Sequence, residues 1–365
     1  MPKRRRKQPK KAKAPKNKLL RAVKGLCLTC SALLWLFVLA CYSLQPDYCA
    51  VLTIWPPWIW LLPGLGMLIL GWMRVARRPA VVLLLLWLGF AGLFSEEPRS
   101  LIRSFSKPKT QEWQLARLKG QALRVISFNC VSKEGIAAEV AKYQPDIVLL
   151  QESPKKKETE ALARQLFGAE GSYLWSHDES IIVHGSIMAV PPESPGDFVH
   201  GDAVLISGQE VEIVNTHIYS RIYNFKFWTK EAWRDQALTR QKQMEQAQKV
   251  AARLKTVQTG RPLILGGDFN APHGDKVFGL FRGRLTDAFN KAGVGWGNTF
   301  SNHHPLVRID QLWLDDHFRP LSVRAQRSER SDHRMVICDL IIKEPGRQLT
   351  TSLPTGRTKR SKPAR

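Results

Sequence analysis

Cysteine is scarce in this chain, and most of it lies near the beginning. Six of the 365 residues are cysteine, and only Cys130 and Cys338 lie beyond position 49. A disulfide-rich scaffold is therefore excluded, because such scaffolds are dense in cysteine. The sequence also contains no evident internal repeat.

Acidic residues are absent from both ends of the chain. Residues 3–24 carry twelve Lys and Arg and no Asp or Glu, and residues 357–365 carry five more basic residues. These two segments supply 17 of the 24 net positive charges, which leaves +7 for the rest. Spread over about 320 residues, that remainder is too small to indicate a protein that coats nucleic acid.

Three apolar runs in the first hundred residues exclude a fully soluble protein. Residues 25–44 contain no charged side chain, and at about 1.5 Å per residue this run matches the ~30 Å hydrocarbon core of a bilayer. It predicts a membrane-spanning helix. A cleaved signal peptide is the competing interpretation, but the run is long for one and two further apolar runs follow it.

The other two apolar runs are less regular. Residues 50–73 are interrupted by three prolines, and Trp55, Trp58 and Trp60 within them suit a membrane interface. Residues 80–94 span only about 22 Å as a helix, so they need a thinned bilayer or snorkelling from Arg77 and Arg78. The sequence predicts about three transmembrane helices, at about 25–44, 50–73 and 78–95.

Charge in the loops predicts the orientation of these helices. The basic segment 1–24 and the loop that carries Arg74, Arg77 and Arg78 are expected to stay in the cytoplasm. Three spans then place everything after residue 95 on the exoplasmic side of a bacterial inner or cell membrane, periplasmic or extracellular. If one run is re-entrant instead, the rest of the chain returns to the cytoplasm. Residues 96–120 are mixed and polar and indicate a linker.

From residue 121 the pattern changes to short β-rich runs that alternate with helical ones, which predicts a mixed α/β domain over 121–343. A long helix is expected at 229–257, and helical spacing also occurs at 135–143. Residues 344–365 have no apolar pattern and predict a disordered basic tail. The expected strands are 123–128, 146–150, 180–184, 186–190, 203–207, 210–216, 262–265, 308–314, 321–325 and 335–342.

Polar side chains that can hold a metal or a phosphate recur at the ends of these strands. Any one of them alone is typical of a turn, a helix cap or a surface residue. Their recurrence at the mouth of a sheet over 200 residues is what indicates a functional site. They are Asn129, Glu152, His217, Asp268, Asn270, Asp310, Asp332 and His333.

The motifs around these residues are SFNC, LLQES, NTHI, GGDFNAP, RIDQL and RSDHR, in this order. With them the chain resembles the endonuclease/exonuclease/phosphatase superfamily over residues 123–342. That superfamily includes DNase I-like nucleases, inositol polyphosphate phosphatases and neutral sphingomyelinases. The resemblance implies a four-layer α/β/β/α sandwich with the site at one edge, which periodicity alone does not predict.

The resemblance also implies a metal site. Hydrolysis of a phosphate ester requires charge neutralisation on the non-bridging oxygens, and a hard divalent cation held by oxygen ligands provides it. Glu152 is the expected main ligand, with Asn129 beside it. Asp332 either binds a metal or supports the ligands. The implied cofactor is Mg²⁺, or Mn²⁺ in its place.

The remaining residues match the catalytic positions of the superfamily. Asp268 is expected to orient or deprotonate the attacking water, and Asn270 to donate its amide to the phosphate. His217 and His333 can donate hydrogen bonds to the developing pentavalent centre. Asp310 matches the acid that pairs with His333. Both Asp268 and His333 remain candidates for the base.

Together these features predict a membrane-anchored, metal-dependent phosphoesterase that meets a lipid bilayer and a phosphorylated substrate. The substrate is a lipid, including a lipid pyrophosphate, or a nucleic acid, which would make the protein an anchored nuclease. Basic and aromatic residues interleave over 221–240, which suits nucleic-acid stacking, a membrane contact or an ordinary helix. A non-catalytic binding module is the third alternative, but every family position carries a competent residue. No obligate protein partner is implied.

Overall fold

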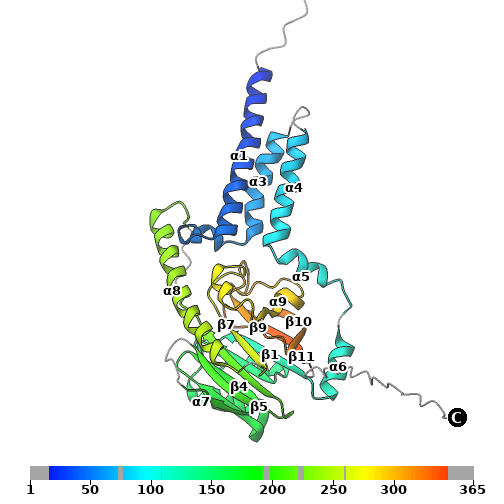
Figure 1. Ribbon diagram of the computed structural model, residues 1–365, viewed down its shortest axis with the longest axis vertical. Helices are drawn as coiled ribbons and strands as arrows, with labels where there is room; N and C mark the ends of the chain where they lie inside the picture. Colours follow the sequence, from blue (N-terminus) through cyan, green and yellow to red (C-terminus); the bar gives the residue numbers. More distant parts are fainter. Residues whose placement is uncertain are drawn as a thin grey trace, which may run out of the picture.

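The computed structural model describes residues 16–72, 77–107, 109–191, 198–220, 226–258 and 260–343. Most of the basic segment 1–24, Arg74, residues 221–225 and the predicted tail 344–365 lie outside the described residues. Apolar helices stand on one end of an α/β sandwich (Figure 1). The residues that carry the candidate site all belong to the sandwich.

The sandwich consists of two sheets that share one strand, β4 (Glu179–Ala189). The first sheet has the order β10-β11-β1-β2-β4, with β3 beside β4, and the second has the order β4-β5-β6-β7-β9-β8. The other strands are β1 (Ala122–Asn129), β2 (Ile147–Gln151), β3 (Gly171–Trp175), β5 (Val199–Leu205), β6 (Glu210–His217), β7 (Leu263–Asp268), β8 (Thr286–Asp287), β9 (Asp310–Leu314), β10 (Phe318–Gln326) and β11 (Met335–Ile342).

The shared strand β4 differs from the sequence-based expectation of two strands, at 180–184 and 186–190. It is continuous: its first half pairs with β2 and its second half with β5. Gly185 lies at the change, with φ +139°, and a Cβ there would lie 2.2 Å from the carbonyl oxygen of Val204. Only glycine fits this close approach without strain, so Gly185 lets one strand leave the first sheet and join the second.

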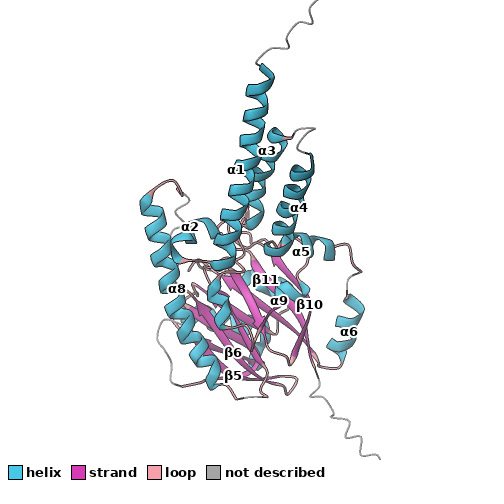
Figure 2. Ribbon diagram, turned by 45° about the horizontal axis from the view of Figure 1, so that its top comes forward, coloured by secondary structure: helices cyan, strands magenta, loops and turns pink. Residues whose placement is uncertain are grey.

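Apolar layers confirm the four-layer α/β/β/α architecture. One buried cluster lies between the sheets and includes Val125, Leu149, Ile213, Ile264 and Val336. The outer face of the second sheet is covered by α8 (Lys230–Thr256) and η5 (Lys276–Leu280). The outer face of the first sheet is covered by η3 (Ala137–Tyr143) and α7 (Lys156–Phe167). Figure 2 shows α8 running along the strands.

Two helices are long and apolar enough to cross a membrane, α1 (Lys16–Leu44) and α4 (Arg77–Phe94). The second apolar run is broken into η1 (Asp47–Cys49) with α2 (Ala50–Thr53), and η2 (Pro57–Trp60) with α3 (Leu61–Gly71). These two parts meet at an angle of 80°, and counting them as one span gives three spans in the described chain. The consecutive prolines Pro56 and Pro57 explain the break, because neither can donate a helical hydrogen bond.

The three apolar helical segments α1, α3 and α4 pack side by side (Figure 1). Trp87 is fully buried between them and donates its indole N–H to Ser31 Oγ at 3.1 Å, and Ser31 donates to the carbonyl of Gly64 at 2.7 Å. Gly64 is required here, because its missing Cβ would lie 2.2 Å from the Trp87 ring. Small residues of this kind let helices approach closely in a membrane.

The segment expected as a linker, 96–120, contains two helices, α5 (Glu97–Arg103) and α6 (Thr110–Leu118). Pro98 lies in the first turn of α5, where the missing N–H costs nothing. The short helix α9 (Ala288–Ala292) packs beside α5 and β10. Glu96 and Glu97 are almost fully buried at this junction, so the chain passes directly from the apolar helices into contacts with the sandwich.

Candidate active site

The predicted site residues meet at one edge of the sandwich, where β1, β6 and β7 end and β9 begins. In the strand register His217 pairs with Asp268, and Asp268 pairs with Asp310. Three functional side chains therefore stand in a row on neighbouring strands of the second sheet. Asn129 ends β1 of the first sheet and faces them.

Asn129 joins the two sheets. Its buried amide Nδ2 donates to Asp268 Oδ2 at 3.0 Å and to Glu152 Oε1 at 3.2 Å. Glu152 follows β2 with φ +41°, in the left-handed region that non-glycine residues rarely adopt. Such strain costs roughly 1–3 kcal/mol and is concentrated at functional sites. It turns the Glu152 carboxylate toward Asn129 at the mouth of the sheets.

Asp310 and His333 form a buried pair, as predicted. Nδ1 of His333 lies 3.0 Å from Asp310 Oδ2 and 3.7 Å from Asp268 Oδ2. Burial alone would lower the pKa of His333, but the carboxylates of Asp310 and Asp268 outweigh it and raise the pKa to about 10. The imidazole is therefore cationic at neutral pH. The ring of Phe300 lies 5.1 Å away and shields it on one side.

His217 forms a second histidine–carboxylate pair. Its Nδ1 lies 2.8 Å from Asp178 Oδ2, and its Nε2 lies 3.8 Å from Asp268 Oδ2 without a hydrogen-bond partner in the described chain. Burial lowers the pKa of His217, but Asp178 and Asp268 outweigh that effect and raise the pKa to about 9. The buried Nε2 therefore faces Asp268 at 3.8 Å and has no hydrogen-bond partner among the described residues.

Sequence reasoning missed Asp178 and Glu179. Glu179 is buried, and its Oε1 accepts the backbone N–H of His217 at 3.3 Å. Burial and the neighbouring Asp178 raise the pKa of Glu179 to about 7. The sequence HDES does contain a run of polar residues just before a strand, but its partner His217 lies 39 residues away from Asp178.

The carboxylates at this edge could hold a divalent cation. Ligand atoms of Asp268, Asp310 and His333 lie within 4.8 Å of one another. His333 is a poor ligand in this arrangement, because its Nδ1 is held by Asp310 and its raised pKa keeps it protonated. The oxygens of Glu152, Asp268 and Asn129 fit a hard cation better. The side chain of Asp332 is exposed and lies outside the group of three, and its metal role stays a prediction.

Asn270 lies two residues after Asp268 and fixes the loop that follows β7. Its backbone N–H donates to Asp268 Oδ1 at 2.9 Å, and its Nδ2 donates to the carbonyl of Ile218 at 3.0 Å. The residue has φ +47° and is buried. These bonds hold the Asp268 carboxylate in one orientation. The expected contact of Asn270 with phosphate stays a prediction.

The loop after Asp268 is bonded to the chain that flanks the apolar helices. Gln45, just after α1, donates to the carbonyl of Gly274 at 2.7 Å. Arg240 of α8 pairs with Asp275 at 2.9 Å and also donates to the hydroxyl of Thr53 in α2. Lys276 pairs with Asp47. Hydrogen bonds and ion pairs with residues 45–53 therefore hold the loop that follows Asp268 and Asn270.

The strand that carries Asp310 is bonded to the segment that follows α4, the last of the apolar helices. Buried Arg308 pairs with Glu96, which follows α4, and with Asp287. The loop before β9 also contacts this segment, because Asn298 donates to Glu97 Oε1 at 3.2 Å. Thr299 then accepts the backbone N–H groups of Ile309 and Asp310. The candidate active-site edge is therefore the edge that contacts residues 45–53 and 96–97, beside the apolar helices.

Comparison with known proteins gives one family match. A family model described as "Endonuclease/Exonuclease/phosphatase family" matches residues 126–333. No curated protein matches the chain.

Solved structures of similar fold include an endonuclease/exonuclease/phosphatase family protein from Bacteroides thetaiotaomicron, with 18% identity, TM-score 0.45 and coverage of 61% of this chain and 98% of that one. The mannosyl-6-phosphatase Bt3783 of the same species has 18% identity, TM-score 0.44 and coverage of 60% and 100%. D. rerio TDP2 in complex with a single-strand DNA product has 16% identity, TM-score 0.44 and coverage of 60% and 98%.

Proposed function

The chain belongs to the endonuclease/exonuclease/phosphatase family. From that premise we propose that it is a membrane-anchored, divalent-metal-dependent phosphoesterase. It cleaves phosphate ester or phosphodiester bonds of a lipid, including a lipid pyrophosphate. The observation that carries the proposal is the convergence of Asn129, Glu152, His217, Asp268, Asp310 and His333 at the edge of the sandwich that is bonded to the membrane-adjacent chain.

The charge of the site supports a metal cofactor. Several carboxylates converge here on two histidines, so the edge is anionic and would repel a phosphate without a bound cation. The carboxylate of Glu152 offers oxygen ligands, and the amide Nδ2 of Asn129 donates to its Oε1 at 3.2 Å. The amide oxygen of Asn129 accepts the backbone N–H of Val131 at 3.0 Å and keeps a second lone pair for a cation. Mg²⁺ held there supplies charge neutralisation on the phosphate oxygens.

The residues of this chain divide the remaining work. Asp268 is buried and oriented by three bonds or close contacts, to Asn129, Asn270 and His217, and it is placed to align a water for attack on phosphorus. The cationic His217 and His333 flank it and can donate to phosphate oxygens as negative charge builds up. Because both histidines are protonated at neutral pH, Asp268 fits the role of base better than His333 does.

Two further features support a substrate held at a bilayer. The loop of Asp268 and the strand of Asp310 are bonded to residues 45–53 and 96–97, directly beside the apolar helices. Phe227 and Trp228, before α8, are exposed, and the Phe227 ring lies 6.5 Å from Trp60 of η2. Exposed aromatic rings at this level suit the headgroup region of a membrane. With three spans, the basic amino-terminal segment stays cytoplasmic and the site is exoplasmic.

The test is an activity panel on the full chain purified in detergent. With Mg²⁺ or Mn²⁺ present, we expect release of phosphate or headgroup from an isoprenyl pyrophosphate or from sphingomyelin, and weaker activity on a soluble phosphodiester reporter. Chelation with EDTA should abolish it. Asp268→Asn keeps the shape of the side chain and should remove activity, whereas Asp316→Asn, on the turn between β9 and β10, should not.

The panel also includes plasmid DNA. Cleavage of DNA at a rate above that of the lipid substrates would replace the lipid proposal with an anchored nuclease. Absence of activity on every substrate with either metal would contradict the enzyme itself.

A further inference from the structure

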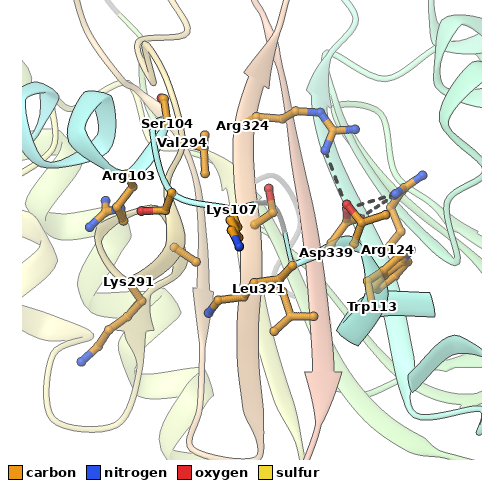
Figure 3. A pocket seen from close by; sticks show the side chains of 15 residues that line it. Arg103, Ser104, Lys107, Trp113, Arg124, Lys291, Val294, Leu321, Arg324 and Asp339 are labelled. Carbon is orange, nitrogen blue, oxygen red and sulfur yellow. Dashed lines mark hydrogen bonds and ion pairs between the residues drawn. The ribbon is translucent and has the colours of Figure 1, made fainter. Parts of the chain in front are cut away.

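A cavity of about 460 Å³ lies on the outer face of the first sheet, away from the candidate active site. The connection between α5 and α6 forms one wall, and α9 with the edge strand β10 forms the other (Figure 3). Its volume lies in the range of small-molecule sites, roughly 300–1,000 Å³. Its charged lining consists of Arg103, Lys107, Lys109, Arg124, Lys291 and Arg324, against one acidic residue, Asp339.

That acidic residue does not balance the cations. Asp339 is held by Arg124, whose Nε lies 2.5 Å from Oδ1, and Arg324 lies 3.7 Å from Oδ2 (Figure 3). Within the part of the chain that the structure describes, Lys107, Lys109 and Lys291 form no ion pair. All three lysines are exposed, so a ligand from solution can reach them.

The cations lie on two walls. Lys107 and Lys109 belong to the segment between α5 and α6. Lys291 belongs to α9, and Arg324 belongs to β10. A ligand with two separate anionic groups could meet cations of both walls at once. Hydroxyls of Thr110 and Ser322 line the same cavity and can donate to phosphate oxygens. Leu321 and Val294 offer apolar surface to an organic body.

The cavity is separate from the catalytic edge. Arg124 and Asn129 both belong to β1 and are five residues apart, which is about 17 Å along a strand. We propose that this cavity is a second site, which binds a small organic ligand that bears two or more phosphate groups. The phosphates lie between Lys107 and Lys109 on one wall and Lys291 and Arg324 on the other.

The test measures binding by calorimetry to the full chain in detergent, in EDTA so that no metal is present at the catalytic edge. Fructose 1,6-bisphosphate is the probe for a free ligand, and fructose 6-phosphate is the monophosphate comparison. A short-chain phosphatidylinositol bisphosphate is the probe for a lipid headgroup. We expect at least one bisphosphate to bind, about tenfold or more tighter than the monophosphate.

Variants locate the binding. Lys107→Gln with Lys291→Gln should weaken bisphosphate binding by about tenfold or more. Lys157→Gln with Lys255→Gln removes the same charge from exposed positions elsewhere and should leave it unchanged. Asp268→Asn, which should abolish the proposed hydrolysis, should also leave it unchanged. Equal weakening in the two lysine pairs, dependence on Asp268, or no binding of either bisphosphate would overturn the second site.

A separate feature concerns two cysteines beside the apolar helices. Cys41 lies in the last turns of α1 and Cys49 ends η1; both are buried, and their Sγ atoms lie 3.2 Å apart. Residues 45–53 between and after them seat the loop of Asp268. Given the exoplasmic orientation in the proposed function, we infer that Cys41 and Cys49 become joined by a disulfide. This bond would fix residues 45–53, which contact the loop that follows Asp268.

The chemistry is thiol–disulfide exchange with an oxidised dithiol protein, the usual oxidant of exoplasmic compartments. One cysteine thiolate attacks the disulfide of the oxidant and displaces a thiolate. The second cysteine then attacks the mixed disulfide, so that the S–S bond forms here, the oxidant leaves as a dithiol and two electrons pass to it.

Mass spectrometry tests the bond on the full chain in its native membrane. Thiols are alkylated with N-ethylmaleimide under denaturing conditions and the digest is examined without reduction. We expect a linked peptide pair of Cys41 and Cys49, with Cys130 and Cys338 alkylated as internal controls. Alkylation of both Cys41 and Cys49 would overturn the disulfide, while the activity panel tests the proposed function independently.

Discussion

Asp268 is the residue on which the candidate site is centred. It belongs to the second sheet, yet it accepts a hydrogen bond from Asn129 of the first sheet, and both histidines lie within 4 Å of its Oδ2. The acid is therefore contacted by two histidines, the side-chain amide of Asn129 and the backbone N–H of Asn270, while it is 1% exposed. These contacts fix the direction of the carboxylate, which alignment of a water requires.

Glu152→Gln tests the metal site at the residue scale. The amide keeps the shape and the bond to Asn129 but removes the charge that a cation needs, so we expect activity to fall by roughly two orders of magnitude or more, beyond the 10–100-fold typical of outer-shell changes. The half-saturating Mg²⁺ concentration should rise as well, measured by titration. Glu245→Gln, exposed on α8, is the control. An unchanged Mg²⁺ titration in Glu152→Gln would remove this residue from the site.

Asp310→Asn tests the histidine pair through pH. If protonated His217 and His333 stabilise phosphate charge, activity should decline as pH rises through about 9 and then about 10, the raised pKa values of these two histidines. The asparagine removes the charge that raises the pKa of His333, so the alkaline limb should move toward the ordinary value of about 6.5 and the rate should drop. Asp332→Asn should mainly alter the metal response. Identical pH–rate profiles for wild type and Asp310→Asn would rule out the pairing.

The same pair has a defined effect on stability. Because folding raises the pKa of His333, the pair contributes its full stabilisation below the unfolded value of about 6.5, and that contribution is lost as pH rises through about 10. Thermal unfolding of the wild type between these limits should therefore show a steeper decline than that of Asp310→Asn, in which His217 and Asp268 are unchanged.

At the scale of elements, β4 determines how the two sheets face each other. The strand passes from one sheet to the other at Gly185, and it carries Glu179 at its site end. A break at this point would separate the sheet of Asn129 from the sheet of Asp268. The geometry of the site therefore depends on a residue that has no chemical role in it.

Gly185→Ala tests this dependence. The new Cβ would meet the Val204 carbonyl oxygen, and φ +139° is unfavourable for alanine, so we expect a loss of roughly 2 kcal/mol or more of unfolding free energy. Gly208→Ala is the matched control: it also has positive φ, +80°, but nothing lies within 4 Å of its Cβ, and it should cost about 1 kcal/mol. Thermal melts of both variants make the comparison, and equal losses would mean that close approach is not what requires Gly185.

Sequence reasoning reached the elements and residues that follow from local pattern. Asn129, Glu152, His217 and Asp268 each end a run of apolar residues, so their convergence could be expected from the rule that strand ends meet at a sheet edge. The pair of Asp310 and His333 came from the family resemblance. Asp178 could not be found in this way, because its role depends on the turn between β3 and β4, and β3 was not predicted. The sequence predicted two strands separated at Gly185, because alternation of apolar residues does not show which sheet a strand belongs to.

On the scale of the whole molecule, the residues beside the apolar helices and the sandwich form one bonded unit. Arg308 is buried between Glu96 and Asp287, and the residues that it joins lie 212 and 21 positions away from it. Contacts at such separations carry no signal in local sequence pattern. They explain why the segment 96–120, expected as a linker, instead fixes the strand of Asp310.

Arg308→Met tests this connection. It leaves two acidic residues without their partner in a buried place, which costs about 3–5 kcal/mol for a broken buried ion pair. Activity should fall with it, because Arg308 lies two residues before Asp310. Adding Glu96→Gln should recover part of the loss, measured as a coupling in a double-mutant cycle. Strictly additive losses would mean that the two residues do not interact.

Topology is the second prediction at this scale. The basic amino-terminal segment and three spans place residue 343 on the exoplasmic side. An alkaline phosphatase fused after Lys343 should therefore be active. A fluorescent protein fused at the same position and exported by the general export pathway should be dark. The opposite pattern would mean that one apolar segment, α3 with η2 before it, does not cross the bilayer.

The bonds between residues 45–53 and the loop of Asp268 also have a consequence for the order of events during synthesis. Thr53 leaves the ribosome 187 residues before Arg240, the side chain that binds it. At about 5–20 residues per second, the apolar helices have roughly ten seconds or more in which to form before their docking partners exist. The contacts of the catalytic edge therefore form last, onto helices that are already in place.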